Sequence, residues 1–389
     1  MAPTAIYASR ILTPHEEILD SVIVVENGKI TQMGHRDEVR IPDDSEHFAA
    51  GDKIVIPGFV DVHIHGAGGH DVMEGTAEAI AKVASTVARR GTTSLVATTV
   101  SAPAEETCKS LHGIARYIRT ARNTDSRFAA EVLGIHLEGP FINPARRGVH
   151  PLDAITPPSK ELFEEFLAAA DGFIRIVTLA PELPGALELV ERAVTNGIVA
   201  SMGHTDATYE QAVAAIERGV THAAHMFNAM RPFSHRDTGV IGAVLTNPAV
   251  TAELIADGHH VDSPAVEILL RAKGLEGVLL VSDGTAATGM RNGNYRLGNF
   301  EVSVTDGVVR NSEGKLAGST LSLDRALQHI VALGVPLLEA VRMVTLLPAR
   351  RLGLGGKKGV IAVGADADIV ILNADLRLAG VMTRGAGLS

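Results

Sequence analysis

Residues 56–66 read IPGFVDVHIHG, an apolar run that ends in two histidines, His63 and His65. Side chains along a β-strand alternate between its two faces, so both histidines project to the same face, close enough to chelate one metal ion. Two histidines at this spacing also occur as ordinary packed residues. The pair therefore predicts a metal site only if the rest of the chain supplies further ligands.

Downstream of this stretch, short apolar segments alternate with amphipathic ones. We expect strands at 60–64, 93–98, 132–137, 174–179, 198–202, 220–224, 251–256 and 278–282. Helical patterns lie between them, for example at 76–90, 159–170, 184–196 and 207–219. Eight strands, each followed by a helix or crossover, predict an α/β fold of the closed (β/α)₈ TIM-like barrel type. The alternative is an open, doubly wound sheet.

The positions of the polar residues favour the barrel. Ionisable residues follow the predicted strands: His63, His65, Glu138, His204, His225, Asp257, His260 and Asp283. Functional groups of (β/α)₈ enzymes lie at the C-terminal ends of the strands, where these residues would meet. Imidazole and carboxylate are ligands of zinc and similar divalent ions. The sequence therefore predicts a metal centre at one mouth of the barrel.

Two residues near these positions have more than one interpretation. Asp283 can ligate the metal ion weakly and exchange protons with a water activated by the ion, or it can cap the segment that follows the last strand. His136, two residues before Glu138, also faces inward, and we expect it to support the site or to pack beside it.

The two ends of the chain read as β structure. Asn27-Gly28 between two apolar runs predicts a hairpin, and residues 359–372 read as short strands. We expect residues 1–56 and 356–389 to form a small β-sandwich domain and residues 57–355 to form the barrel that holds the metal centre. Residues 286–318 are rich in glycine, predict a hairpin around Asp306-Gly307, and are placed to cover a substrate.

Composition excludes several classes of function. The 389 residues include 35 Lys and Arg against 45 Asp and Glu, a net charge of −10, which argues against nucleic acid as a partner. The sequence contains no run of about 20 apolar residues that could span a membrane. Cys108 is the single cysteine, and we expect it to be a packing residue rather than a nucleophile. The N-terminal residues lack the pattern of a signal peptide, so we expect a cytoplasmic protein.

Several of these segments together resemble the amidohydrolase superfamily. The marks are PGFVDVHIHG (57–66), the strand-end histidines and acid, and GADADIVIL (364–372). Within that superfamily the chain resembles the N-acetylglucosamine-6-phosphate deacetylases. The segments that carry this resemblance are HLEGPFINPARRGVHP (136–151), GHTDAT (203–208), HMFNAM (225–230), IADGHHVD (255–262) and SDGT (282–285).

The resemblance implies a metal-dependent hydrolase of amino-sugar metabolism that converts N-acetylglucosamine 6-phosphate to glucosamine 6-phosphate and acetate. It implies one or two divalent ions, with zinc expected and iron, manganese, cobalt or cadmium as alternatives. It also implies a phosphorylated amino sugar as ligand and a homodimer, in which a second subunit often helps to bind the phosphate.

Position by position, the resemblance makes Glu138, His204 and His225 metal ligands and Asp283 the acid that transfers protons. The substrate-binding positions that it implies are His150, Asn228, Ala229, Arg236 and His260. The guanidinium of Arg236 can bind two phosphate oxygens at once. Some members replace the first histidine pair and bind one ion. Because this chain keeps His63 and His65, the resemblance favours a second site there, with Glu138 able to bridge, and one or two bound ions both fit it.

Two other functions fit the same fold. One is an amidohydrolase that acts on another N-acetyl amino sugar or on a cyclic amide, such as dihydroorotase. Many enzymes of the cyclic-amide type use a carboxylated lysine between two metals, whereas Glu138 fills that place here. The other is a non-catalytic scaffold, which typically loses ligands that this chain retains.

Overall fold

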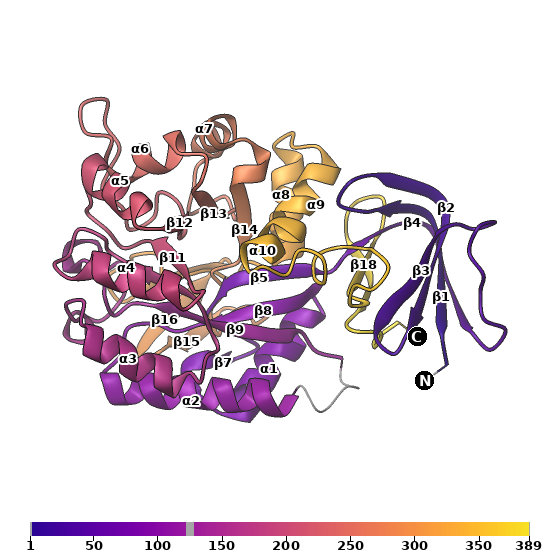
Figure 1. The fold of residues 1–389 in the computed structure, drawn as a ribbon, viewed down its shortest axis with the longest axis horizontal. Helices are drawn as coiled ribbons and strands as arrows, with labels where there is room; N and C mark the ends of the chain where they lie inside the picture. The colour runs from indigo at the N-terminus through magenta and orange to yellow at the C-terminus, as the bar shows by residue number, and fades with distance from the viewer. Residues whose placement is uncertain (1, 122–127, 389) are drawn as a thin grey trace.

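The computed structural model describes residues 2–121 and 128–388, and an eight-stranded parallel barrel forms its centre (Figure 1). The barrel strands are β5 (Phe59–Ile64), β8 (Thr92–Thr98), β9 (Glu131–Glu138), β10 (Ile174–Leu179), β11 (Val199–Met202), β12 (Val220–Ala223), β13 (Thr251–Ile255) and β14 (Val278–Val281). They pair in chain order from β5 to β14. Each predicted strand is confirmed to within one residue at either end.

Contacts between β5 and β14, the first and last strands, close the barrel. Ile64 and Gly284 form a parallel bridge, and the backbone N–H of Asp283 donates to the carbonyl of His63 at 2.9 Å. The buried carboxylate of Asp61 accepts a hydrogen bond from the backbone N–H of Ser282. The open, doubly wound sheet is therefore excluded.

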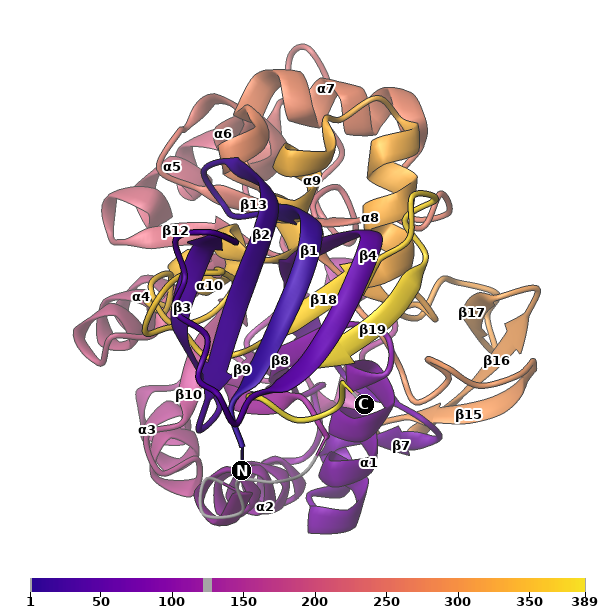
Figure 2. The ribbon, with the colours of Figure 1, turned by 90° about the vertical axis from the view of Figure 1, so that its right-hand side faces the viewer.

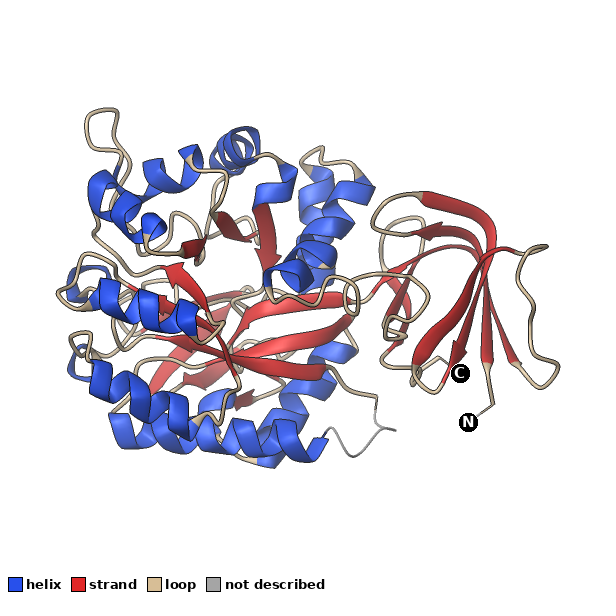
Figure 3. Cartoon of the chain, viewed as in Figure 1, coloured by secondary structure: helices blue, strands red, loops and turns tan. Residues whose placement is uncertain are grey.

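Helices surround the barrel (Figure 3). They are α1 (Ala77–Ala88), α2 (Ala104–Ala121), α3 (Lys160–Ala169), α4 (Ala186–Thr195), α5 (Tyr209–Glu217), α6 (Gly239–Thr246), α7 (Ser263–Lys273), α8 (Leu323–Ala332), α9 (Leu337–Val344) and α10 (Leu346–Arg351). Side-chain caps define where several of them begin, as at α5, where Thr208 and Gln211 form a capping box. Among the described residues, no helix combines the length and apolarity needed to cross a membrane.

Both ends of the chain contribute to one six-stranded sheet beside the barrel (Figure 2). Its strands are β1 (Thr4–Leu12), β2 (Glu17–Glu26), β3 (Lys29–His35), β4 (Glu46–Pro57), β18 (Ile369–Leu372) and β19 (Leu378–Met382). The sheet has an apolar core of its own, which includes Ile6, Ile23, Val55 and Ile371. The two termini thus pair as expected, and the exact domain boundaries remain a prediction.

The excursion after β14 forms a small antiparallel sheet. It consists of β15 (Gly293–Leu297), β16 (Phe300–Thr305) and β17 (Val308–Asn311), with the predicted turn at Asp306-Gly307 between β16 and β17. Two short strands, β6 (Gly66–Ala67) and β7 (His70–Asp71), follow β5. The backbone N–H of Gly298 donates to the buried carboxylate of Asp71 at 2.9 Å, which holds the β15–β16 turn against β7.

Candidate active site

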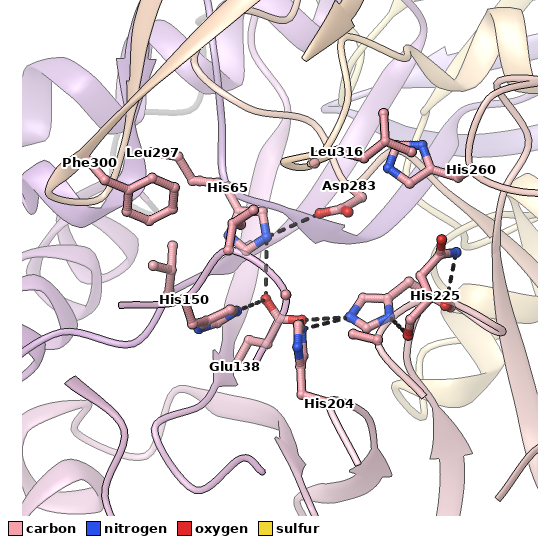
Figure 4. A pocket seen from close by; sticks show the side chains of 16 residues that line it. His65, Glu138, His150, His204, His225, His260, Asp283, Leu297, Phe300 and Leu316 are labelled. Atoms are coloured by element: carbon pink, nitrogen blue, oxygen red, sulfur yellow. Dashed lines mark hydrogen bonds and ion pairs between the residues drawn. The ribbon is translucent and has the colours of Figure 1, made fainter. Parts of the chain in front are cut away.

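Ionisable side chains from five barrel strands gather around one point (Figure 4). They come from the ends of β5, β9, β11, β12 and β14 and are His63, His65, Glu138, His204, His225 and Asp283. The backbone φ angles of His204, His225 and Asp283 are positive, at 48°, 28° and 48°. This left-handed conformation is costly outside glycine and is concentrated at functional sites. The strands therefore end in strained turns at three of the predicted residues.

Glu138 lies at the centre of the group and is 2% exposed. Its Oε1 atom lies 3.0 Å from His225 Nε2, 3.3 Å from His204 Nε2 and 3.4 Å from His63 Nε2. Its Oε2 atom lies 3.4 Å from His65 Nε2. His150 Nε2 also lies 3.7 Å from Oε2, so one carboxylate faces five imidazoles. This arrangement is expected if Glu138 bridges two neighbouring cation positions.

The orientation of three of these rings identifies their free nitrogen. The Nδ1 atoms of His65, His204 and His225 lie 3.0, 3.0 and 3.2 Å from the backbone carbonyl oxygens of Thr98, Arg146 and Asn228. A carbonyl oxygen can only accept, so each Nδ1 carries the proton. In the neutral rings the lone pair of Nε2 then points toward the centre, as metal ligation requires.

His63 follows the same rule with a different partner. Its Nδ1 atom lies 2.8 Å from Glu253 Oε2, and its Nε2 atom is buried without a hydrogen-bond partner. That Nε2 atom lies 3.7 Å from Asp283 Oδ1, and His65 Nε2 lies 3.1 Å from the same oxygen. A buried nitrogen without a partner is costly in an apolar interior, and a cation would satisfy it.

The donor atoms present fit a divalent metal ion. Among the described residues, three sets of side chains bring their ligand atoms within 4.8 Å of one another: His63, His65 and Glu138; Glu138, His150 and His204; and His63, His136 and Glu253. Imidazole nitrogens and carboxylate oxygens are the ligands of catalytic zinc and related ions. The first two sets contain most of the ligands that the sequence predicts.

The charges of the site perturb one another's protonation. Burial works against the ionised carboxylates, yet the surrounding imidazoles hold the pKa of Glu138 well below its usual value and lower the pKa of Asp283. Burial likewise works against protonated histidine, but the carboxylates raise the pKa of His65 and His225. Burial lowers the pKa of His204 to about 4. The site therefore has a strong attraction for positive charge, which a metal ion can use.

Two further histidines near Glu138 differ in what they can bind. His150 Nδ1 accepts from the backbone N–H of Ser101 at 3.1 Å, so its neutral ring presents Nε2–H as a donor to the pocket. His136 is saturated, because its Nδ1 lies 3.2 Å from the carbonyl oxygen of Val62 and its Nε2 lies 2.7 Å from Thr178 Oγ1. Burial lowers its pKa to about 3. His136 thus supports the barrel interior and leaves no nitrogen free for an ion.

A pocket of about 230 Å³ opens above this group. Asn228, Ala229 and His260 line it together with the predicted ligands other than His63, which lies buried beneath. Apolar residues of the pocket include Val100, Val149, Leu297, Phe300 and Leu316. Leu297 and Phe300 of the β15–β16 hairpin lie on the side of His65 and His150, and His260 lies across the pocket beyond Asp283 (Figure 4). The excursion thus forms one wall of the pocket.

His260 and Arg236, two of the predicted substrate contacts, lie in different places relative to the pocket. His260 Nδ1 lies 2.7 Å from Asp257 Oδ2, and hydrogen bonds from His260 overcome the effect of burial and lower the pKa of Asp257 to about 2. Arg236 is exposed on the loop 231–237 and is not one of the residues that line the pocket. The structure therefore brings His260 to the site and leaves Arg236 outside it.

Sequence reasoning missed two residues beneath the site. Glu253 of β13 and His222 of β12 are fully buried, and His222 Nε2 lies 2.9 Å from Glu253 Oε1. The available signal was a single acidic residue in the otherwise uncharged strand TAELI (251–255), where an unpaired carboxylate would be costly. Cys108, which the sequence predicts to be a packing residue, packs against the main apolar core. Burial and Glu165 raise the pKa of its thiol to about 11.

A closed (β/α)₈ barrel with converging imidazoles and carboxylates at its C-terminal rim defines the class of barrel hydrolases built around a divalent metal centre. Comparison with known proteins agrees with this class. The profile of the amidohydrolase family matches residues 54–386.

Individual relatives narrow the class further. N-acetylglucosamine-6-phosphate deacetylase of Bacillus subtilis is 35% identical over 96% of this chain and 94% of its own length. N-acetylgalactosamine-6-phosphate deacetylase of Escherichia coli O157:H7 is 37% identical over 86% of this chain and 87% of its own. A mutant N-acetyl-D-glucosamine-6-phosphate deacetylase of Mycobacterium smegmatis, solved with N-acetyl-D-glucosamine-6-phosphate, superposes with a TM-score of 0.92 at 35% identity, covering 100% of this chain and 99% of the other. The chain belongs to the amidohydrolase family and, within it, to the N-acetylglucosamine-6-phosphate deacetylases.

Proposed function

We propose that this protein hydrolyses the acetamide of N-acetylglucosamine 6-phosphate to glucosamine 6-phosphate and acetate. The observation that carries the proposal is the convergence of Asp283 with four imidazole Nε2 atoms around Glu138, at the base of a pocket with polar and apolar walls. The relatives that match most of this chain carry the same activity in their names.

The roles of the residues follow from their surroundings. Glu138, His204 and His225 would hold one divalent ion, and His63 and His65 with Glu138 a second. Bound there, the ion supplies polarisation of the amide carbonyl and of the attacking water. We propose zinc, because imidazole and carboxylate in this ratio are its usual catalytic ligands.

Asp283 carries the proton transfers of the proposed reaction. Its carboxylate is held ionised and faces the centre, so it can accept a proton from the attacking water and pass that proton to the departing amine nitrogen. The Nε2–H group of His150 is a donor aimed into the pocket and suits the substrate oxygen near the reacting amide. Asn228, Ala229 and His260 also line the pocket and suit the sugar and its phosphate.

Arg236 supports a proposal about assembly. Its guanidinium suits a phosphate, but it lies on the exposed loop 231–237, outside the pocket of its own chain. We propose a homodimer in which Arg236 reaches the substrate phosphate at the partner's site. Light scattering should give twice the chain mass, and Arg236→Ala should raise KM for the phosphorylated sugar while leaving the metal content unchanged. A monomer with full activity would contradict this assembly.

The single cysteine and the class of relatives support a cytoplasmic location.

The decisive experiment measures acetate release from a panel of substrates. We expect the fastest acetate release from N-acetylglucosamine 6-phosphate, and slower release from the 6-phosphates of N-acetylgalactosamine and N-acetylmannosamine. Dihydroorotate should remain intact. The galactosamine compound is the strongest competitor because a relative with that name is 37% identical. Asp283→Asn should keep its metal and lose about 10²–10⁴-fold in rate. Equal turnover by the parent and this variant would remove Asp283 from the mechanism.

A further inference from the structure

Glu253 is a buried carboxylate whose contacts are made with the metal centre rather than with solvent. Its Oε2 atom lies 2.8 Å from His63 Nδ1 and accepts from the backbone N–H of His225 at 3.0 Å. Its Oε1 atom lies 2.9 Å from His222 Nε2. In the described part of the chain, Glu253 forms ion pairs with His63 and His222. All three side chains are fully buried.

One oxygen of Glu253 therefore joins two parts of the site. It holds the ring of His63, from the end of β5, and the backbone of His225, just after β12. This contact orients His63 so that its unpartnered Nε2 atom lies 3.4 Å from Glu138 Oε1 and 3.7 Å from Asp283 Oδ1. The position of the His63 lone pair thus depends on Glu253.

Glu253 also differs in kind from the groups that hold the other imidazoles. Backbone carbonyl oxygens accept hydrogen bonds from the Nδ1–H groups of His65, His204 and His225. These carbonyl groups select the tautomer of each ring without adding a charge. A carboxylate at the same position selects the tautomer and makes the ring a stronger ligand, because it stabilises positive charge that the ring shares with a bound ion. Among these four histidines, His63 alone has such a partner.

The balance of charge points in the same direction. The carboxylates that face the centre are Glu138 and Asp283, and one divalent ion neutralises both. A second divalent ion would add two uncompensated positive charges in a buried site, which is costly. Glu253 supplies a further negative charge, separated from the position of the second ion by the ring of His63. The first ion does not require that charge.

We propose that Glu253 is a positioning residue that commits His63 to a second ion, beside the ion held by Glu138, His204 and His225. This inference rests on the proposed function, since it takes the metal centre as given. It extends that function by assigning the control of the second ion to a residue outside the ligand set.

The test is Glu253→Gln, with Zn²⁺ as the probe. The amide oxygen can still accept from His63 and from the backbone of His225. The amide NH₂ can donate to His222 Nε2 when that ring carries its proton on Nδ1, which lies 2.7 Å from Thr251 Oγ1. The variant therefore removes the charge and keeps a hydrogen bond at each contact. Metal-buffered solutions set the free Zn²⁺ concentration, and bound zinc per chain is measured by mass spectrometry. We expect two ions per chain in the parent. In the variant, the first ion should bind as before. The second ion should bind about 10–100-fold more weakly, which is the usual effect of changing a residue that holds a metal ligand.

Glu182→Gln is the matched control. Glu182 accepts hydrogen bonds from the backbone N–H of Asp206, from Thr205 Oγ1 and from Asn143 Nδ2, so its partners in the described part of the chain are not the imidazoles of the site. Its variant should bind both ions like the parent. Retention of both ions by Glu253→Gln, or an equal weakening of both, would overturn the inference. A parent that binds one Zn²⁺ per chain would also overturn it, whereas a parent without acetate release counts against the proposed function alone.

A second measurement decides the matter if Glu253→Gln fails to fold. Ring-labelled histidine in the zinc-loaded parent, observed by ¹⁵N NMR, reports which nitrogen of His63 carries the proton. A proton on Nδ1, shifted downfield by its bond to a carboxylate, supports the role of Glu253. A proton on Nε2 excludes His63 as an ion ligand and overturns the inference.

Discussion

Strand β9 carries an acidic residue at each end, and neither carboxylate is well hydrated. The groups that surround the two carboxylates differ in kind. Glu138 closes the strand at the mouth of the barrel, surrounded by imidazoles. Glu131 opens it at the other end, where Lys358 Nζ lies 2.6 Å from Glu131 Oε2. The same lysine lies 2.9 Å from Asp366 and 2.8 Å from Asp368 and is 1% exposed.

The difference between the ends separates stability from function. At the base, burial alone would lower the pKa of Lys358, but its three carboxylates raise it, and the chain supplies its own cation. At the mouth the carboxylates face converging imidazole nitrogens, and a cation that binds there comes from solution. In (β/α)₈ enzymes the C-terminal face is catalytic and the N-terminal face serves stability, and β9 shows this division along a single strand.

The largest effect we expect comes from removing the charge at the mouth. Glu138→Gln leaves His204 and His225 with a neutral partner in place of the carboxylate between them. Loss of an outer-shell partner costs about 10–100-fold in metal affinity or activity, so loss of a central ligand should cost more than about 100-fold in both. Bound metal and acetate release measure it. A variant that retains full metal and rate would show that Glu138 is not a ligand.

The matching change at the base should affect folding and leave the chemistry intact. Lys358→Met removes the cation that Glu131, Asp366 and Asp368 share, and an apolar side chain takes its place. Lys29 still pairs with Asp366, and Arg384 lies 3.7 Å from Glu131. Removing one partner of a buried ion pair costs about 3–5 kcal/mol, so the free energy of unfolding should fall by that amount. Chemical denaturation followed by circular dichroism measures the loss, and kcat well below the unfolding transition should equal that of the parent. A large loss of kcat in folded protein would contradict the separation of the two ends.

The loss of unfolding free energy in Lys358→Met should depend on pH, which is a smaller effect with a definite sign. Despite burial, Lys358 lowers the pKa of Glu131 and Asp366 below their ordinary values of 4.5 and 3.8. Groups whose pKa is lowered on folding contribute stability above their unfolded pKa and lose it as the pH falls through the folded pKa. The difference between the parent and Lys358→Met should therefore be full near neutral pH and narrow below about pH 4. A deficit that grows in acid would contradict the ion-pair explanation.

The sequence predicts the barrel and the mouth far better than it predicts the base. Strands were visible because each is a short apolar run, and the site was visible because histidines and acids follow those runs. Lys358 stands in the glycine-rich segment LGGKKG (354–359), which has the composition of an exposed loop. Its burial depends on carboxylates up to 227 positions away, at Glu131, and no spacing along the chain signals such a contact. Glu253 differs, because a single acidic residue in the strand TAELI (251–255) is a signal of burial, but nothing along the chain indicates His63 and His222 as its partners.

Asp71 adds a third way of burying a carboxylate, with backbone donors in place of either cation. It is 4% exposed and accepts from the backbone N–H groups of Met73 at 2.7 Å and Gly298 at 2.9 Å. Burial raises the pKa of Asp71, whereas the pKa values of Glu138 and Glu131 are lowered. Hydrogen bonds from neutral groups therefore compensate for burial less fully than a charged partner does.

Asp71→Asn is the mildest of the changes and the one whose pH dependence has the opposite sign. The amide can accept one backbone hydrogen bond and loses the other, a cost of about 1 kcal/mol. Because Gly298 then loosens and Leu297 and Phe300 line the pocket, KM should rise a few-fold with kcat little changed. A group whose pKa is raised on folding loses stability as the pH rises through that value, so the parent's advantage over Asp71→Asn should be greatest in acid. An advantage that grows toward neutral pH would show that Asp71 is held by a cation after all.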